Sequence, residues 1–262
     1  MKNRVLGIGN ALVDALVQVQ DEALLTEMNL PKGSMQLIDT EGYEAVCRRL
    51  SQMQVKRATG GSAANTVLAL SHLGAQPGII GRVSEDDNGH FFADNCKRVG
   101  IETFLLPSEL PTGVASTFIT PDGQRTFATY LGAAATLHAD DLRPEWLEGY
   151  AYLYIEGYLV QDHDLICRAV EMAHAAGLKV CLDLASYNIV EAQHEFFSYL
   201  LDHTDIVFAN EEEALAFTGK GPREALDLLA QRCEVAVVKT GKEGAMARRG
   251  EEFAQAPAEP VA

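Results

Sequence analysis

Residues 57–66 read Arg57-Ala-Thr-Gly-Gly-Ser-Ala-Ala-Asn-Thr66, at a point where a helix over 62–73 is expected to begin. Two adjacent glycines, Gly60 and Gly61, are followed there by small residues and by Asn65. A helix start needs one capping residue and little glycine, so the additional small residues indicate that something approaches the backbone closely. Close packing of the helix against a sheet is one explanation. A small polyhydroxylated ligand held by backbone N–H groups is the other.

Short apolar runs alternate with amphipathic stretches along most of the chain. The runs are almost continuously hydrophobic, which is typical of strands buried on both faces of a parallel sheet. They lie at 5–9, 78–83, 152–155, 179–183, 205–208 and 235–239. Helices are expected between them, near 62–73, 87–99, 162–176, 190–202, 211–217 and 222–232. This alternation predicts an α/β fold with a doubly wound, mostly parallel sheet flanked by helices.

One region departs from this alternation. Two β-rich segments, 114–120 and 125–130, flank Pro-Asp-Gly and predict a hairpin. The strand-like stretches 15–19 and 34–38 are too close together to hold a crossover helix. A small antiparallel β sheet is therefore expected, with strands drawn from about 12–20, 33–39 and 112–131. Periodicity alone does not separate a lid over a binding site from a decorative edge sheet.

Composition narrows the classes of partner. The 262 residues include 21 Lys and Arg against 37 Asp and Glu, a formal net charge of −16. This acidity argues against nucleic acid and anionic membranes as partners.

The length suits one large α/β domain or two small ones, and one domain over 1–262 is expected. Five widely spaced cysteines and an N-terminus without a long apolar stretch predict a cytoplasmic protein.

Polar residues near the carboxyl end of the first predicted strand are candidates for ligand binding, because open α/β sheets bind ligands at such ends. Asn10 and Asp14 stand there, and Asp14 lies among apolar neighbours. An ionised carboxylate in apolar surroundings needs a partner, and a sugar diol would supply two hydroxyl donors. A turn residue and a surface charge are the simpler interpretation. With Gly60, Gly61 and Asn65, a small polyhydroxylated ligand is favoured.

Two later strand ends carry similar residues. Asn210 ends a strand, and Glu213 lies on the same helical face one turn on. The acids at 211–213 suit a helix start, but Glu213 could also hold a hydrated magnesium ion. At the end of the next strand, Thr240 and Gly241 could hold phosphates through the backbone, or simply form a hairpin turn.

Taken in order, these segments resemble the ribokinase-like (PfkB) family of sugar and nucleoside kinases. The matching segments are GGSAANT at 60–66, GRVSEDDNG at 81–89, YLGAA at 130–134, NEEE at 210–213 and KTGKEG at 239–244. The resemblance extends over essentially the whole chain. GNALVD at 9–14 and the YLGAA segment look most like the adenosine-kinase-like branch.

This resemblance implies that the small sheet is a lid over a sugar site. The implied substrate-binding residues are Asn10, Asp14, Gly60, Gly61, Asn65 and Glu156. Asp14, Gly61 and Asn65 would hold the substrate hydroxyls, whereas Glu156 is the weakest candidate. The implied reaction transfers the γ-phosphoryl group of ATP to the primary hydroxymethyl of a sugar or ribonucleoside, either adenosine-like or ribose- or fructose-like.

The resemblance also implies a nucleotide site. Asn210 and Glu213 match the N-x-x-E motif, which organises Mg²⁺ and phosphate through water. Thr240, Gly241 and Gly244 match the segment that lines the ATP site. A monovalent cation is a further candidate cofactor. The expected assembly is a monomer or a lid-mediated homodimer.

The sequence departs from the family in one respect. A second signature, of the form DTxGAGD, supplies the catalytic aspartate base and should follow the edge strand expected at 251–257. The printed sequence reaches Ala262 without it. The base is therefore expected beyond Ala262, no catalytic residue is assigned, and the 262 residues alone are expected to be inactive. A shortened version of a longer enzyme is favoured over a non-catalytic sugar- or nucleoside-binding protein.

Overall fold

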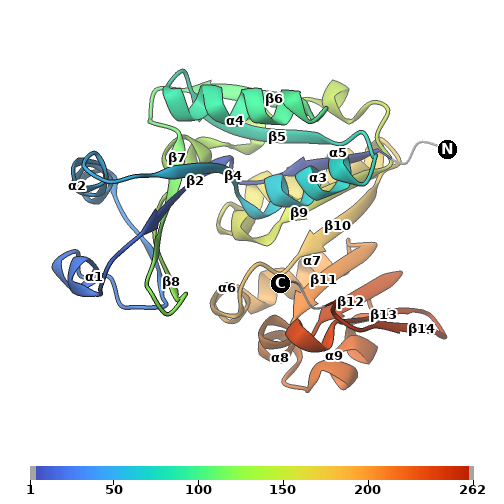
Figure 1. Ribbon diagram of the computed structural model, residues 1–262. Helices are drawn as coiled ribbons and strands as arrows, with labels where there is room; N and C mark the ends of the chain where they lie inside the picture. The colour runs from blue at the N-terminus through green and yellow to red at the C-terminus, as the bar shows by residue number, and fades with distance from the viewer. Residues whose placement is uncertain (1–3, 260–262) are drawn as a thin grey trace. The chain divides into compact units, whose positions relative to one another are not determined.

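The computed structural model describes residues 4–259, which form two compact units (Figure 1). Of the described residues, the first unit comprises 4–8, 75–78 and 138–259, and the second comprises 9–74 and 79–137.

The first unit contains a mostly parallel sheet. Its strands are β1 (Val5–Ile8), β9 (Tyr152–Glu156), β10 (Lys179–Asp183), β11 (Ile206–Asn210), β12 (Val235–Lys239), β13 (Ala245–Arg249) and β14 (Glu252–Ala256). They are ordered β14-β13-β12-β11-β10-β9-β1. The neighbours from β1 to β12 pair in parallel, whereas β13 and β14 pair antiparallel. The carboxyl ends of β9, β10, β11 and β12 therefore share one edge, where polar residues can meet.

Helices connect these strands. They are α5 (His163–Ala175), α6 (Tyr187–Ala192), α7 (His194–Leu201), α8 (Glu211–Thr218) and α9 (Pro222–Leu229), with short 3₁₀ turns η2 (Ala139–Asp141), η3 (Pro144–Leu147), η4 (Gly157–Gln161) and η5 (Gly241–Glu243). The Asp162 side chain caps α5 by accepting from the Leu165 N–H. The single helix expected over 190–202 is wrong, because the chain breaks at Gln193 and forms α6 and α7.

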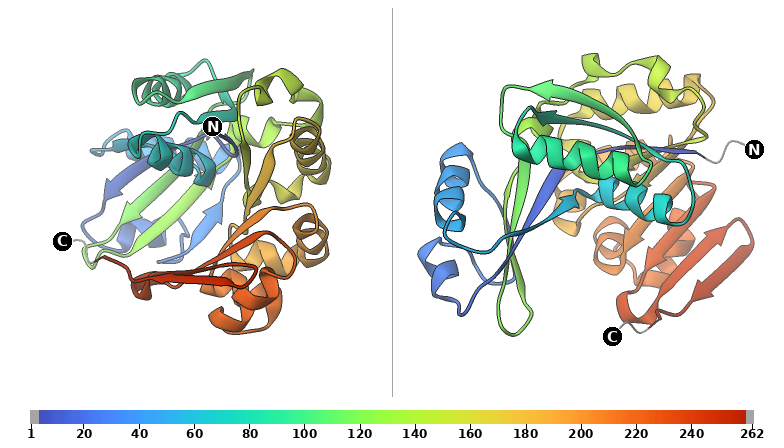
Figure 2. Two further views of the ribbon diagram at one scale, coloured as in Figure 1. Left: turned by 90° about the vertical axis from the view of Figure 1, so that its right-hand side faces the viewer. Right: turned by 45° about the horizontal axis from the view of Figure 1, so that its top comes forward.

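The second unit contains a five-stranded sheet, here called the small sheet. Its strands are β2 (Leu12–Gln18), β3 (Met35–Leu37), β4 (Lys56–Gly60), β7 (Gly113–Ile119) and β8 (Arg125–Tyr130), ordered β3-β8-β7-β2-β4. The hairpin of β7 and β8 is seen along its length in the right-hand view of Figure 2. The sheet is mixed rather than antiparallel, because β2 pairs in parallel with β7 and β3 pairs in parallel with β8.

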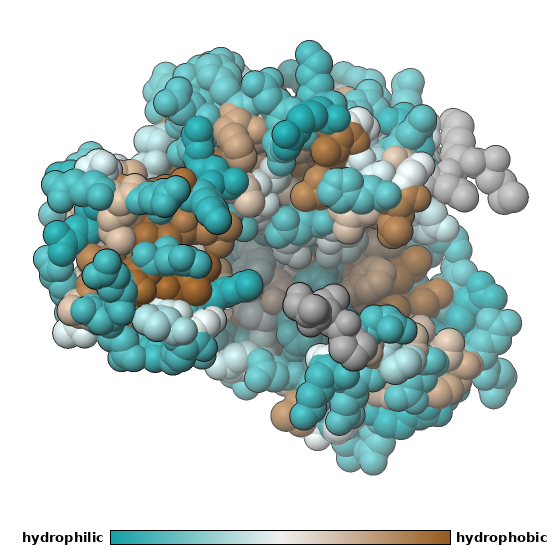
Figure 3. Space-filling view, in the orientation of Figure 1, coloured by the Kyte–Doolittle hydropathy of each residue, from teal (hydrophilic) through white to brown (hydrophobic). Residues whose placement is uncertain are grey.

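The remaining elements of this unit include four helices and two further strands, β5 and β6, which neighbour each other in the nine-stranded sheet and are not part of the small sheet. They are the helices α1 (Ala23–Glu27), α2 (Thr40–Leu50), α3 (Ser62–His72) and α4 (Asp87–Arg98), the turn η1 (Gly132–Thr136), and the strands β5 (Gly78–Ser84) and β6 (Glu102–Ser108). A buried cluster joins α1 and α2 to one face of the sheet through Leu25, Val46 and Phe118. Figure 3 shows apolar residues gathered over the part of the surface where α1, α2 and the small sheet lie.

Candidate functional site

Gly60 and Gly61 join β4 to α3. A Cβ atom on Gly60 would lie 2.3 Å from Asp14 Oδ1, and one on Gly61 would lie 2.1 Å from the Asn10 carbonyl oxygen. Gly61 is also the N-cap of α3, with a φ of +93° that favours glycine. The close approach inferred from the sequence is thus made, at least in part, by β2 and the residues before it. Packing within the chain accounts for both glycines, and the ligand expected there stays a prediction.

Asp14 is a half-buried carboxylate on β2, which lies between β7 and β4 in the small sheet. Within residues 4–259, no hydrogen bond or ion pair joins its side chain to another residue, and its oxygens are not fully buried. Burial raises the pKa of Asp14 above its ordinary value of 3.8. A partly desolvated carboxylate with no protein partner can accept hydrogen bonds from the hydroxyl groups of a ligand.

The burial of Asp14 leads to a testable prediction about stability. We expect Asp14→Asn to raise the melting temperature at neutral pH, because the ionised carboxylate destabilises the folded state above its raised pKa. As the pH falls through the raised pKa towards 3.8, the wild-type carboxyl becomes protonated and the advantage of the variant should disappear. Thermal unfolding of both proteins between about pH 4 and pH 8 checks this. A constant difference across that range would contradict it.

The other substrate candidates of the second unit lie around Gly60 and Gly61. Asn10 is buried beside Gly61, and Asn65 is exposed on the first turn of α3, where its N–H donates to the Gly61 carbonyl. Five of the six predicted residues are therefore brought together by β2, β4 and α3. The sixth, Glu156, belongs to the first unit, at the end of β9.

The face of the small sheet that carries Asp14 is largely apolar. The pairing register places Asp14 opposite Ala115, Ala115 opposite Thr129, and Thr129 opposite Leu37. The next row runs from Leu16 through Thr117 and Phe127 to Met35. On the edge strand of this face, Leu37 is 56% exposed and Met35 is 46% exposed. A carboxylate beside exposed apolar side chains suits a ligand that has both hydroxyl groups and an apolar ring.

In the first unit, Asn210 and Glu213 form a capping box at the start of α8. The Glu213 N–H donates to Asn210 Oδ1 at 2.8 Å, and the Asn210 N–H donates to Glu213 Oε2 at 2.8 Å. Asn210 Nδ2 donates to the second carboxylate oxygen at 2.6 Å. Burial raises the pKa of Glu213, and the neighbouring Asp183 contributes in the same direction. Asn210 and Glu213 therefore cap the N-terminus of α8.

This arrangement bears on the expected magnesium ion. Among the described residues, no group of three or more His, Cys, Asp and Glu side chains is placed to hold a metal. Both Glu213 oxygens already accept hydrogen bonds from Asn210, yet each carboxylate oxygen retains further lone pairs for water. The residues present thus fit a hydrated ion bound through water rather than a metal held directly by several side chains.

The segment from Thr240 to Gly244 joins β12 to β13. Thr240 N and Oγ1 both donate to the Gly244 carbonyl, so this is also a closed hairpin turn. A Cβ atom on Gly244 would lie 1.9 Å from the Ala256 carbonyl oxygen, so packing against β14 requires this glycine. A Cβ on Gly241 would meet only Glu211 Oε1, at 3.8 Å. Gly241 therefore presents the most accessible backbone of the three predicted residues.

Two charged residues at these strand ends were missed by sequence reasoning. Asp183 ends β10, and Lys239 ends β12, where its Nζ lies 3.2 Å from Asp183 Oδ2. Both residues could have been found from the sequence as polar residues at the carboxyl ends of predicted strands. Their ion pair could not, because it crosses β11 and depends on the order of the strands in the sheet.

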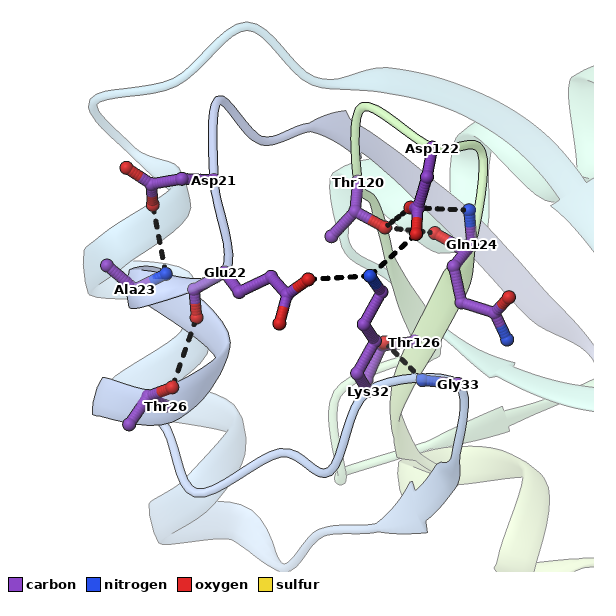
Figure 4. Close-up of polar contacts among 10 residues, drawn as sticks. All are labelled: Asp21, Glu22, Ala23, Thr26, Lys32, Gly33, Thr120, Asp122, Gln124 and Thr126. Atoms are coloured by element: carbon purple, nitrogen blue, oxygen red, sulfur yellow. Dashed lines mark hydrogen bonds and ion pairs between the residues drawn. The ribbon is translucent and has the colours of Figure 1, made fainter.

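Other features of the structure lie apart from these residues. A pocket beside α1 is lined by Glu22, Leu25, Thr26, Asn29, Leu30, Pro31 and Lys32. Figure 4 shows Lys32 Nζ between the carboxylates of Glu22 and Asp122, each at 2.6 Å. These ion pairs connect the chain after α1 to the hairpin turn.

Within the described part of the chain, no helix is long and apolar enough to cross a membrane.

Together, the parallel sheet with its polar strand ends and the small mixed sheet define a ribokinase-like α/β fold. The chain belongs to the pfkB family of carbohydrate kinases, whose profile matches residues 32–262. This confirms the resemblance stated from the sequence and the α/β fold predicted with it.

Similar proteins include nucleoside and sugar kinases. The crystal structure of adenosine kinase from Sinorhizobium meliloti has 33% identity and a TM-score of 0.88, covering 100% of this chain and 82% of that one. A probable sugar kinase from Rhizobium etli CFN 42 has 30% identity and a TM-score of 0.88, covering 99% and 80%. Guanosine-inosine kinase of Escherichia coli K12 is 26% identical over 231 residues, which are 82% of this chain and 53% of that kinase. The chain thus spans about half the length of this curated relative.

Proposed function

We propose that this protein is an ATP-dependent kinase that phosphorylates the primary hydroxymethyl group of a ribonucleoside. The observation that carries the proposal is the half-buried Asp14 carboxylate, which has no partner within residues 4–259 and lies on a largely apolar sheet face. A ribose diol would satisfy the carboxylate, and a base would cover apolar surface that ribose or fructose alone leaves exposed. The likeness to an adenosine kinase and to a guanosine-inosine kinase supports the same choice.

In this proposal each unit holds one reactant. Asp14 and Asn65 orient the sugar hydroxyls, and the backbone at Gly241 meets the nucleotide. ATP would supply the phosphoryl group, and a bound Mg²⁺ would supply charge neutralisation. Glu213, held by Asn210, orients water around the ion. In phosphoryl transfer, positioning and charge neutralisation provide most of the rate acceleration, so these residues bind and orient.

Ligand binding tests the acceptor. We expect isothermal titration calorimetry to detect adenosine, inosine or guanosine and to find ribose and fructose much weaker, because only the nucleosides bury a base on the apolar face. A ligand that binds only the folded protein should also raise its melting temperature. Tight binding of a free sugar with no preference for nucleosides would contradict the proposed acceptor. Binding of neither class would contradict the proposed site.

Substitutions test the residues. We expect Asp14→Ala and Asn65→Ala each to weaken nucleoside binding by about 1 to 3 kcal/mol, the usual effect of removing a partner from a buried hydroxyl. Asp94→Ala, an exposed acid on α4, is the matched control and should leave the affinity unchanged. Calorimetry that finds wild-type affinity in both site variants would remove these residues from the proposed site.

Several expectations from the sequence belong to this proposal and stay predictions. These are a requirement for a monovalent cation, a monomeric or homodimeric state, and a cytoplasmic location. Dialysis against sodium or potassium during calorimetry tests the first, and light scattering tests the second.

A further inference from the structure

One face of the main sheet gathers charged side chains at the carboxyl ends of β9 to β12. The register places Glu156 opposite Asp183, Asp183 opposite Phe208, and Asn210 opposite Lys239. Residues two apart on a strand share a face, so Phe208 and Asn210 point the same way. Lys239 is therefore a direct neighbour of Asn210 and reaches past Phe208 to Asp183.

The two members of the Asp183–Lys239 pair differ sharply in exposure. The Asp183 side chain is 10% exposed, whereas that of Lys239 is 47% exposed. A buried carboxylate that holds a half-exposed ammonium group fixes the direction of the lysine while leaving hydrogen-bond donors for another anion, since an ammonium group has three. The pair is thus arranged to present a positive charge at the surface.

Asp183 also holds the backbone that follows β10. Its Oδ1 accepts from the Ala185 N–H at 3.0 Å, while Oδ2 accepts from Lys239. Ala185 has a φ of +66°, in the left-handed region that a residue with a Cβ rarely adopts. Strained backbone of this kind persists where its surroundings hold it and is frequent at functional sites. Each oxygen of Asp183 therefore has a separate positioning task.

The charges around Lys239 are mostly acidic. Glu156 and Asp183 are buried acids at the ends of neighbouring strands, and Glu213 is a buried acid in the first turn of α8, which follows β11. A triphosphate brought to these strand ends would be repelled by carboxylates unless cations stand between them. Lys239 lies next to Asn210 and directly before Thr240, at the start of the turn that contains Gly241.

We propose that Lys239 binds the polyphosphate of the nucleotide through its ammonium group and that Asp183 is the residue that positions it. The inference rests on the proposed function, because it takes ATP as the ligand of this strand edge. It adds one phosphate-binding residue and one positioning residue that were not expected from the sequence.

The test measures binding of ATP, with Mg²⁺, and of adenosine to the full chain by calorimetry. Lys239→Met should weaken ATP binding about 10- to 100-fold, the effect of losing one hydrogen bond to a charged group, and should leave adenosine binding unchanged. Lys242→Met is the matched control, since Lys242 is exposed in the same turn and has no ion pair among the described residues. Lys239→Arg keeps the charge and should restore most of the affinity.

Asp183→Asn separates the two tasks of this carboxylate. The asparagine Oδ1 can still accept from the Ala185 N–H, but its Nδ2 cannot pair with Lys239. We expect ATP binding to weaken about 3- to 10-fold, with adenosine binding unchanged. Wild-type ATP affinity in Lys239→Met, or equal losses in Lys239→Met and Lys242→Met, would overturn the role of Lys239. Wild-type affinity in Asp183→Asn would overturn positioning by Asp183. A wild-type protein that binds no ATP would instead contradict the proposed function.

Discussion

Gly61→Ala is expected to destabilise the protein by about 3 kcal/mol or more, because the new Cβ atom collides with backbone that cannot move aside. The atom would lie 2.1 Å from the Asn10 carbonyl oxygen. The substitution also forces alanine into a φ of +93°. Relief requires β2 and α3 to separate, which would disturb Asn10 and Asp14 together. Urea unfolding followed by circular dichroism measures the change.

Gly74→Ala is the matched control for this prediction. Gly74 has a φ of +85°, similar to that of Gly61, but a Cβ atom there would meet nothing within 4 Å. Its expected cost is about 1 kcal/mol, which is the backbone term alone. The difference between the two variants therefore isolates the collision. If both variants lose the same stability, the contact with Asn10 is not what requires Gly61.

The main sheet was predictable from the sequence because its central strands are buried on both faces. Such strands read as continuous apolar runs, and the runs at 152–155, 179–183 and 235–239 fall within observed strands. The strands β4 and β6 were missed. β4 has two exposed basic residues and ends in glycine, and β6 contains a proline, so neither shows a strand pattern. Both strands form only by pairing with strands that lie elsewhere in the sequence, β4 with β2 and β6 with β5.

The candidate site was predictable only where its residues are close in sequence or match a motif. Asn210 and Glu213 are three residues apart, and their capping box is a local structure. The contact between Asp14 and Gly60 joins β2 to β4, and the ion pair between Asp183 and Lys239 spans 56 residues. These contacts depend on strand order and register, which a single sequence does not specify.

Phe118→Ala is expected to destabilise the second unit by about 3 to 5 kcal/mol, the usual cost of emptying a fully buried aromatic position. Phe118 is 0% exposed and packs with α1 and α2 on the face of the small sheet opposite Asp14. Without it, a cavity remains between the sheet and its two helices. Hydrogen exchange should show faster exchange in β2, β7 and β8 than in β10 or β11.

Phe127→Ala, in the same hairpin, should affect nucleoside binding more than it affects stability. Phe127 is only half-buried and lies on the Asp14 face, in the row that ends at Met35. Its removal should cost less than about 1.5 kcal/mol of stability, because less apolar surface is lost from the core. Nucleoside affinity should nevertheless fall, since the base loses part of its apolar surface, whereas ATP affinity should not change. If Phe118→Ala and Phe127→Ala change stability and nucleoside affinity equally, the prediction is wrong. The two faces of the small sheet would then not have separate roles in folding and in ligand binding.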